Sequence, residues 1–122
     1  MDDSRGYEVH YYVDGRGKVP VKAYIDGVTE KEQAKIFTYI ELLRKMGGYL
    51  DEPYAKHITG KIRELRVDFS RSRHRIFYFI FIGRKIILLH AFLKKTPKTP
   101  QKEMNRALEN YQDVLIHKQK YE

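Results

Sequence analysis

Three β-strand patterns follow one another between residues 62 and 93, and this run restricts the possible folds more than any other feature of the chain. In residues 62–69, apolar side chains alternate with charged ones, which is the period of a strand with one covered face. Residues 73–82 and 85–93 are more apolar, and the last segment is apolar on both faces, as is typical of a central strand. The connections are short, with Ser70-Arg71-Ser72 in the first and Gly83-Arg84 in the second. They predict two hairpins, the second with a type II′ turn, and therefore an antiparallel sheet.

Along the chain, helices are predicted before and after this run, and an opening strand is predicted over residues 7–12. Pro20 suits the first turn of a short helix over residues 20–26. Thr29-Glu30-Lys31-Glu32 is a capping box, and an apolar stripe at three-residue steps follows it up to Met46. Residues 101–115 have the pattern of a last amphipathic helix. At 122 residues, we expect one α+β domain (1–122): an antiparallel-rich, four-stranded sheet with N-terminal helices and a C-terminal helix packed on it.

The charge is unevenly distributed along the chain. Its formal net charge is +8, yet residues 56–106 contain 14 basic and 3 acidic residues, while the remainder contains 10 basic and 13 acidic ones. Positive charge gathered in one half of a domain predicts a polyanionic partner, and phosphate backbones are the commonest one. The alternative is a surface whose charge only keeps the protein soluble.

Several functional classes are disfavoured by composition. The chain has no cysteine, which excludes disulfides, zinc–thiolate sites and cysteine nucleophiles. No apolar run approaches the roughly 18 residues of a membrane span, and the first twenty residues lack the apolar region of a secretory signal, so we expect a cytoplasmic protein. The five histidines are scattered and carboxylates are scarce in the basic half, so we expect neither a metal nor a cofactor. A glycine-rich phosphate loop and a G-x-S-x-G elbow are both missing, which disfavours NTP-dependent enzymes and proteases.

Cations projecting from the paired strands are the remaining candidates. Strand-borne arginine offers a planar fork that matches phosphate oxygens, and neighbouring aromatic rings stack on unpaired bases. The candidate catalytic residues are Arg66, Arg73, Arg75, His90, Lys94 and Lys95, and the candidate RNA-binding residues are Arg63, Arg71, Phe92, Lys98 and Lys102. The alternative for each cation is a structural role at a strand end, paired with Glu64 or Asp68.

RNA cleavage suits such a group because RNA carries its own nucleophile, the 2′-hydroxyl. The protein then has to remove a proton, stabilise charge on the phosphate and protonate the leaving oxygen. Arginine cannot act as the base. Histidine is the side chain whose unperturbed pKa lies near neutrality, which makes His90 and His74 candidates for proton transfer. A lysine whose pKa is lowered by neighbouring cations is a substitute, and His90 has the alternative role of a structural imidazole held in the sheet.

The segment Leu88–Pro100, which reads LLHAFLKKTPKTP, resembles the phage-derived Gp49-like/HigB branch of the RelE toxin superfamily, as do Glu64-Leu65-Arg66 and Arg75-Ile76-Phe77-Tyr78. The resemblance covers about residues 7–115. It implies a compact RNase-like fold, cleavage of mRNA in the ribosomal A site, and a cognate HigA-like antitoxin with a helix-turn-helix domain. Arg66 matches the basic position that closes the first motif.

By the same resemblance, Arg75 matches the arginine that contacts the scissile phosphate, and Lys94 and Lys95 match the basic pair that ends the last strand. RelE-type toxins often carry a catalytic tyrosine near the C-terminus. Tyr111 lies on the apolar side of the predicted helix, so this role is not carried over.

The resulting prediction is the toxin of a type II toxin–antitoxin pair. We expect a metal-independent, ribosome-dependent mRNA endoribonuclease that inhibits translation, without a membrane partner and with DNA bound only through the antitoxin complex. Two alternatives remain. One is a non-catalytic module that binds RNA or ribosomes, and the other is a degenerate toxin that acts with its partner as a DNA-binding regulator.

Overall fold

The computed structural model describes residues 6–122. Residues 1–5, which belong to the segment expected to lack a secretory signal, lie outside the described residues. The elements in chain order are β1 (Glu8–Tyr11), α1 (Pro20–Asp26), α2 (Glu30–Lys45), β2 (Ala55–Thr59), β3 (Ile62–Phe69), β4 (Ser72–Phe81), β5 (Lys85–Leu93), α3 (Gln101–Ile116) and the short 3₁₀ helix η1 (Lys118–Tyr121). The predicted α+β class is confirmed.

The sheet has five strands in the order β1-β5-β4-β3-β2, so the predicted count of four is wrong. The additional strand is β2, which pairs antiparallel with β3 and lies in the region between Met46 and residue 62, for which no element was predicted. Only Ala55 of its five residues is buried, and an edge strand of this kind has no apolar alternation to reveal it. The opening strand β1 pairs parallel with β5, which makes the sheet mixed.

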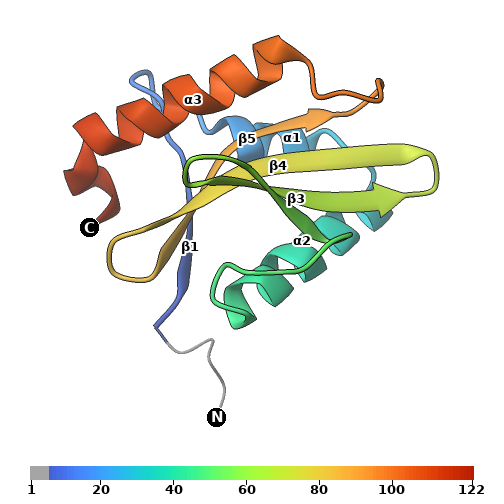
Figure 1. Ribbon diagram of the computed structural model, residues 1–122, viewed down its shortest axis with the longest axis horizontal. Coiled ribbons are helices and arrows are strands. Elements are labelled where there is room, and N and C mark those ends of the chain that lie inside the picture. The colour runs from blue at the N-terminus through green and yellow to red at the C-terminus, as the bar shows by residue number, and fades with distance from the viewer. Residues whose placement is uncertain (1–5) are drawn as a thin grey trace.

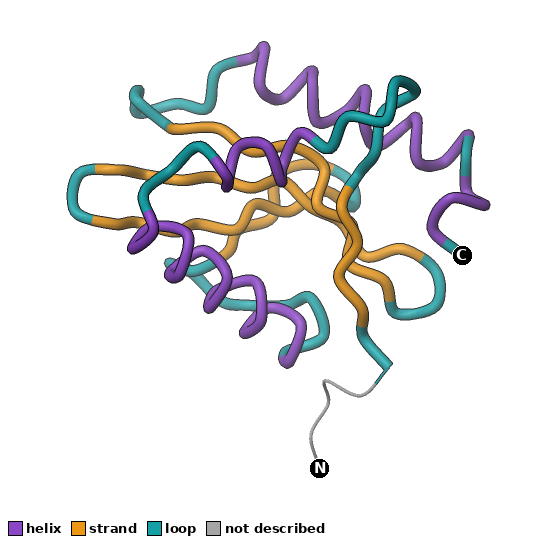
Figure 2. Tube along the Cα trace, turned by 180° about the vertical axis from the view of Figure 1, so that it is seen from behind, coloured by secondary structure: helices purple, strands orange, loops and turns teal. Residues whose placement is uncertain are grey.

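Helices cover both faces of the sheet (Figure 1). Helix α3 lies across one face, where Phe77, Phe79 and Phe81 of β4 pack with the buried residues of the helix. The view from behind shows α1 and α2 in front of the opposite face (Figure 2), where Ile76 and Tyr78 belong to a second core. Strands β4 and β5 are therefore buried on both sides, which confirms the prediction of a central strand over residues 85–93.

Helix α2 begins as predicted, because the Thr29 hydroxyl accepts a hydrogen bond from the backbone N–H of Glu32 at 3.2 Å. Its predicted apolar stripe is partly wrong. The buried residues are Ile36, Ile40 and Leu43, whereas Phe37 is 49% exposed and Met46 is 55% exposed. Steps of three residues drift around a helix of 3.6 residues per turn, so a stripe drawn at that spacing leaves the core-facing side.

Both predicted hairpins are present. In the second, φ is 78° at Gly83 and 60° at Arg84. The pairing of Phe81 with Lys85 leaves three residues in this connection, and a type II′ turn has a positive φ at its first central residue alone, so the predicted two-residue type II′ turn is wrong. Within residues 6–122, the structure has no helix of the length and apolarity that crossing a membrane requires.

Candidate functional site

Four cations meet on the face of the sheet that also carries α3. Arg66 and Arg75 are directly opposite each other on β3 and β4. Lys94 follows the end of β5, and Lys56 comes from β2. The charges of Lys56, Arg66 and Arg75 all act on the Lys94 ammonium. We call Lys56, Arg66, Arg75 and Lys94 the cation cluster.

A buried carboxylate lies among these cations. Glu64 was expected on an exposed strand face, but it is fully buried and lies opposite Lys56 in the β2–β3 register. Its Oε1 is 3.1 Å from Nε of Arg66 and 3.9 Å from Nε of Arg75. One negative charge at this depth offsets part of the repulsion between the four cations. Among the described residues, Oε2 of Glu64 and Nε of Arg75 have no hydrogen-bond partner.

Arg75 is buried, and its outer nitrogen is engaged by an exposed carboxylate. Its Nη1 donates to Oδ1 of Asp68 at 2.7 Å and to the carbonyl oxygen of His74 at 3.0 Å. The Asp68 side chain is 62% exposed, so little is lost when it exchanges its ion pair for water. A carboxylate oxygen on a guanidinium occupies the kind of position that a phosphate oxygen takes.

Lys94 differs electrostatically from an ordinary surface lysine. Burial of its ammonium lowers its pKa, and the charges of Arg75, Arg66 and Lys56 act in the same direction, against the opposing effect of Glu64. A lowered pKa increases the neutral fraction of the amine, which is the form that accepts a proton. The expectation that cationic neighbours depress a lysine here agrees with this direction.

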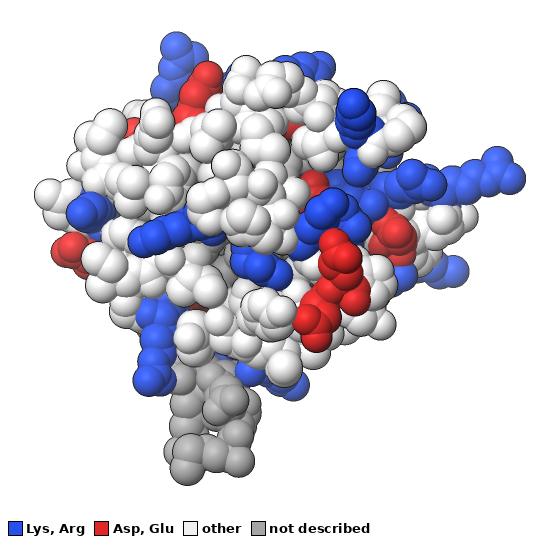
Figure 3. All heavy atoms as spheres, viewed as in Figure 1, with Lys and Arg blue, Asp and Glu red and all other residues white. Residues whose placement is uncertain are grey.

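An open basic groove continues from the cation cluster along the end of the β3–β4 hairpin. Its volume is about 560 Å³, and its lining includes Arg71, Arg73, Lys94 and Lys95. In the space-filling view, Lys and Arg side chains gather over this end of the molecule (Figure 3). The structure thus brings Arg66, Arg75 and Lys94 together in the cation cluster, and it places the other predicted catalytic cations in the adjoining groove.

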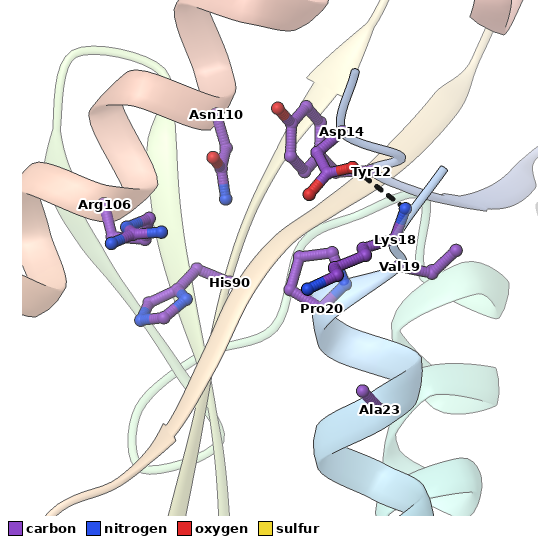
Figure 4. Close-up of a pocket in the computed structure, with 9 residues that line it drawn as sticks. All are labelled: Tyr12, Asp14, Lys18, Val19, Pro20, Ala23, His90, Arg106 and Asn110. Atoms are coloured by element: carbon purple, nitrogen blue, oxygen red, sulfur yellow. Dashed lines mark hydrogen bonds between the residues drawn. The ribbon is translucent and has the colours of Figure 1, made fainter. Parts of the chain in front are cut away.

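His90 lies apart from the four cations. Its Nε2 is 2.8 Å from Oε1 of Glu103 on α3, and its ring stacks nearly parallel to Phe77 and Phe92. It lines a separate cavity between α3 and α1 (Figure 4). Phe92 is 5% exposed and belongs to the core beneath α3, so its ring does not offer a free face to an RNA base in this conformation.

The other candidates occupy three further places. Arg63 points to the opposite face of the sheet, where its Nε donates to the Tyr78 hydroxyl at 3.2 Å and its Nη2 to the Leu50 carbonyl at 3.2 Å. His74 is buried on that same side, between the Tyr24 hydroxyl and the Glu32 carboxylate. Lys98 and Lys102 are exposed on the loop after β5 and on the first turn of α3.

Two residues of the site were not predicted from the sequence. Lys56 belongs to β2, the strand that was missed, so no argument from strand parity reached it. Glu64 was considered only as a partner for surface cations. The sequence signal for its burial is the presence of Arg66 two residues along the same strand and of Arg75 on the next strand. A carboxylate placed beside two arginines can be buried because they balance its charge. No group of three or more His, Asp or Glu side chains that could hold a metal ion occurs within residues 6–122.

The family model for phage-derived Gp49-like proteins matches residues 23–112, which is most of the chain. The chain belongs to the Gp49-like family. This family is a RelE/HigB-like toxin family, and a toxin family implies an antitoxin partner. The matched residues include the whole cation cluster of this Gp49-like protein. A comparison with curated proteins gives no significant match.

Proposed function

We propose that this Gp49-like protein is a HigB-type toxin of a type II toxin–antitoxin pair that cleaves mRNA on the ribosome. The observation that carries the proposal is the cation cluster, in which Arg66, Arg75 and Lys94 lie around the buried Glu64. The toxin family adds independent support. Fixed positive charge on a sheet face suits a phosphate group that gains negative charge during a reaction.

The proposed reaction uses the 2′-hydroxyl of the RNA. Its oxygen attacks the adjacent phosphorus, and an O2′–P bond forms while the P–O5′ bond breaks, which gives a 2′,3′-cyclic phosphate. The 2′-hydroxyl loses a proton to a base, and the departing 5′-oxygen receives a proton. The reaction as written requires neither a metal nor another cofactor.

The geometry suggests a role for each cation. Arg75 contacts the scissile phosphate, displacing Asp68 from Nη1, and Arg66 supports it from the neighbouring strand. Lys94 in its neutral form takes the proton from the 2′-hydroxyl, because its pKa is lowered. Arg73 and Lys95 in the basic groove hold the neighbouring part of the mRNA backbone.

We propose that a HigA-like helix-turn-helix antitoxin silences the toxin in the cytoplasm and that DNA is bound only through their complex. A partner with an acidic contact surface associates quickly with the excess of positive charge over residues 56–106. In this proposal, free toxin inhibits translation and arrests growth.

Cleavage of a reporter mRNA on purified ribosomes tests the proposal. The wild-type protein should produce discrete fragments ending in a 2′,3′-cyclic phosphate, and Arg75→Ala and Lys94→Ala should produce few or none while still binding ribosomes. Lys22→Ala, which replaces an exposed cation on α1, is the matched control and should cut normally. Treatment of the protein with EDTA, followed by removal of the EDTA before the magnesium-containing ribosomes are added, should leave cleavage unchanged. If folded wild-type protein yields no fragments on any ribosomal complex, the proposed activity is wrong.

A non-catalytic RNA- or ribosome-binding module is the second candidate. It is favoured by the position of His90, which is held by Glu103 away from the cation cluster. Such a module would block translation of the reporter and leave the mRNA intact, so the same assay distinguishes the two functions.

A further inference from the structure

A second cavity lies at the edge of the sheet, beside His90 and between α1 and α3. Pairing between β1 and β5 ends at Tyr11 and Leu88. Beyond this point β5 still pairs with β4, but no strand lies on its other edge, where α1 and α3 flank it. The space between them has a volume of about 530 Å³. Its lining residues come from β5, α1, α3 and the segment that connects β1 to α1 (Figure 4). Cavities of a few hundred Å³ hold small organic ligands.

The charged groups around this cavity favour an anion. Lys18 and Arg106 enter from the β1–α1 connection and from α3. Among the described residues, the Lys18 ammonium forms no ion pair, and the ion pair of Arg106 is a long contact of 3.8 Å with the exposed Glu109, which contributes little.

Asp14 also lines the cavity, but its carboxylate is already engaged. It accepts hydrogen bonds from the backbone N–H groups of Arg16 and Lys18 at 2.8 and 2.9 Å. The same hydrogen bonds lower its pKa. The carboxylate therefore stabilises the turn of the connecting segment. Its charge also interacts with that of Lys18, but among the described residues the Lys18 ammonium forms no ion pair with it, so Lys18 and Arg106 can both contact an incoming ligand.

Two polar side chains that line the cavity, Asn110 and His90, have atoms available for hydrogen bonds with the heterocyclic ring of a ligand. Asn110 is buried, and its amide nitrogen donates to the Leu89 carbonyl at 2.8 Å. This bond fixes the side chain, while its amide oxygen accepts no hydrogen bond from the residues of the described range. His90 uses Nε2 for Glu103, which leaves Nδ1 without a partner in the same range. Val19, Pro20 and Ala23 supply apolar wall area.

From these contacts we infer that the cavity is a nucleotide-binding site, distinct from the cation cluster. The phosphate is held by Lys18 and Arg106, and the base lies against the apolar wall with Asn110 and His90 as its hydrogen-bonding partners. The ligand is either a free nucleoside 5′-monophosphate or one nucleotide of an RNA chain. The inference does not depend on RNA cleavage, because it concerns binding in a different cavity.

Titration of the full chain with AMP, GMP, CMP and UMP, followed by calorimetry and by NMR, tests the inference. At least one should bind and shift resonances of residues that line the cavity. Ala23→Leu fills the cavity from a helical position without removing a polar group, and it should weaken binding at least tenfold. Arg106→Ala should also weaken binding roughly tenfold, because it removes a charge-assisted hydrogen bond.

Arg16→Ala is the matched control, since Arg16 is an exposed cation of the same connecting segment that does not line the cavity. Its affinity should equal that of the wild type, and circular dichroism should show that all variants are folded. A short RNA oligonucleotide forms the second arm. If it binds more weakly to Ala23→Leu than to Arg16→Ala while the free nucleotides fail to bind, the site is a subsite for RNA. If neither ligand distinguishes Ala23→Leu from Arg16→Ala, the inference is wrong.

Discussion

The chemistry of the cation cluster depends on a few individual residues whose charges are only partly balanced. Within residues 6–122, Glu64 is the one acidic residue buried among the four cations, and it makes its closer contact with Arg66 rather than Arg75. Arg75 is consequently held on its outer side by Asp68, an exposed residue. A phosphate can replace Asp68 without leaving a buried charge unpaired, so Arg75 is ready for an anionic ligand.

We expect Arg75 to be the most sensitive position for activity. Arg75→Ala should reduce the cleavage rate by about 10²–10³, the usual effect of removing a group that stabilises transition-state charge. Arg75→Lys should restore little of it, because an ammonium keeps the charge but lacks the planar fork. Single-turnover cleavage of ribosome-bound mRNA measures both. Normal rates for folded, ribosome-binding Arg75→Ala would remove the centre of the proposed site.

The pH dependence of cleavage should reveal whether Lys94 moves a proton. The base must be neutral, so the rate should rise with pH until it passes the pKa of Lys94, which lies below that of an ordinary lysine. Lys94→Arg keeps the charge but stays protonated, so this rising limb should disappear. The measurement is kcat/KM against pH, with Lys22→Arg as the control that retains the limb. An unchanged profile in Lys94→Arg would assign the proton transfer to another group.

His90 has its own diagnostic substitution. His90→Gln keeps a hydrogen-bonding side chain towards Glu103 but cannot titrate. Because His90 lies apart from the cation cluster, we expect this variant to cut RNA at nearly the wild-type rate with an unchanged pH–rate profile. Loss of activity together with one limb of the profile would instead make His90 the catalytic acid or base.

Strand alternation explains how much of the site could be predicted residue by residue. Side chains two apart on a strand share a face, so alternation relates Arg73 to Arg75 and Phe92 to Lys94, but it does not show that Arg66, Arg75 and Lys94 of different strands meet. The same parity included His90, yet it could not show that Glu103 of α3 engages this ring. Strand parity identifies a face of a sheet, but it does not show which residues of a packed helix lie over it.

At the scale of elements, the segment between α2 and β2 was the least predictable part of the fold. Most helices and the hairpin strands have clear periodicity, whereas β2 is a polar edge strand with one buried residue. This strand completes the site, because it carries Lys56 into the cation cluster. The connection that leads to it contains Gly48, where φ is 85° and a Cβ atom would lie 2.6 Å from Cδ1 of Ile80.

Gly48→Ala should therefore destabilise the protein by two separable effects. A non-glycine residue at this φ costs about 1–3 kcal/mol, and the contact with Ile80 adds about 1–3 kcal/mol of overpacking. Gly17→Ala is the matched control, since its φ is 83° but nothing lies within 4 Å of the added Cβ. Urea unfolding of both variants measures the difference. Equal losses would show that Ile80 moves aside without cost.

At the scale of the whole molecule, several cations of residues 56–106 gather at the end of the sheet formed by the β3–β4 hairpin, whereas Arg84 and Lys85 lie at the opposite end, in the β4–β5 hairpin. The basic groove and the exposed Lys98 and Lys102 extend this region beyond the cation cluster. Such an arrangement can hold several phosphates of one RNA chain at a time. Its contribution to affinity should then depend strongly on salt.

Replacement of Lys98 and Lys102 by Ala should test this arrangement. If each contacts a phosphate, the slope of log K against log salt should decrease by about one unit for each lost contact, while the cleavage rate of bound RNA stays the same. Binding to RNA or ribosomes over a range of salt concentrations measures the slope. An unchanged slope would make the two lysines part of an ordinary solvated surface.

The parallel pairing of β1 with β5 also has a consequence for the order of folding. Strands β2 to β5 are joined by short connections, so they can pair through contacts that are local in the sequence. Strand β1 instead pairs Glu8 with Lys85, which is far away along the chain. Closing a long loop costs entropy before any contact repays it. We therefore expect the hairpins to form first and the N-terminal strand to dock last. During synthesis, the N-terminal strand therefore has no partner until β5 has also left the ribosome.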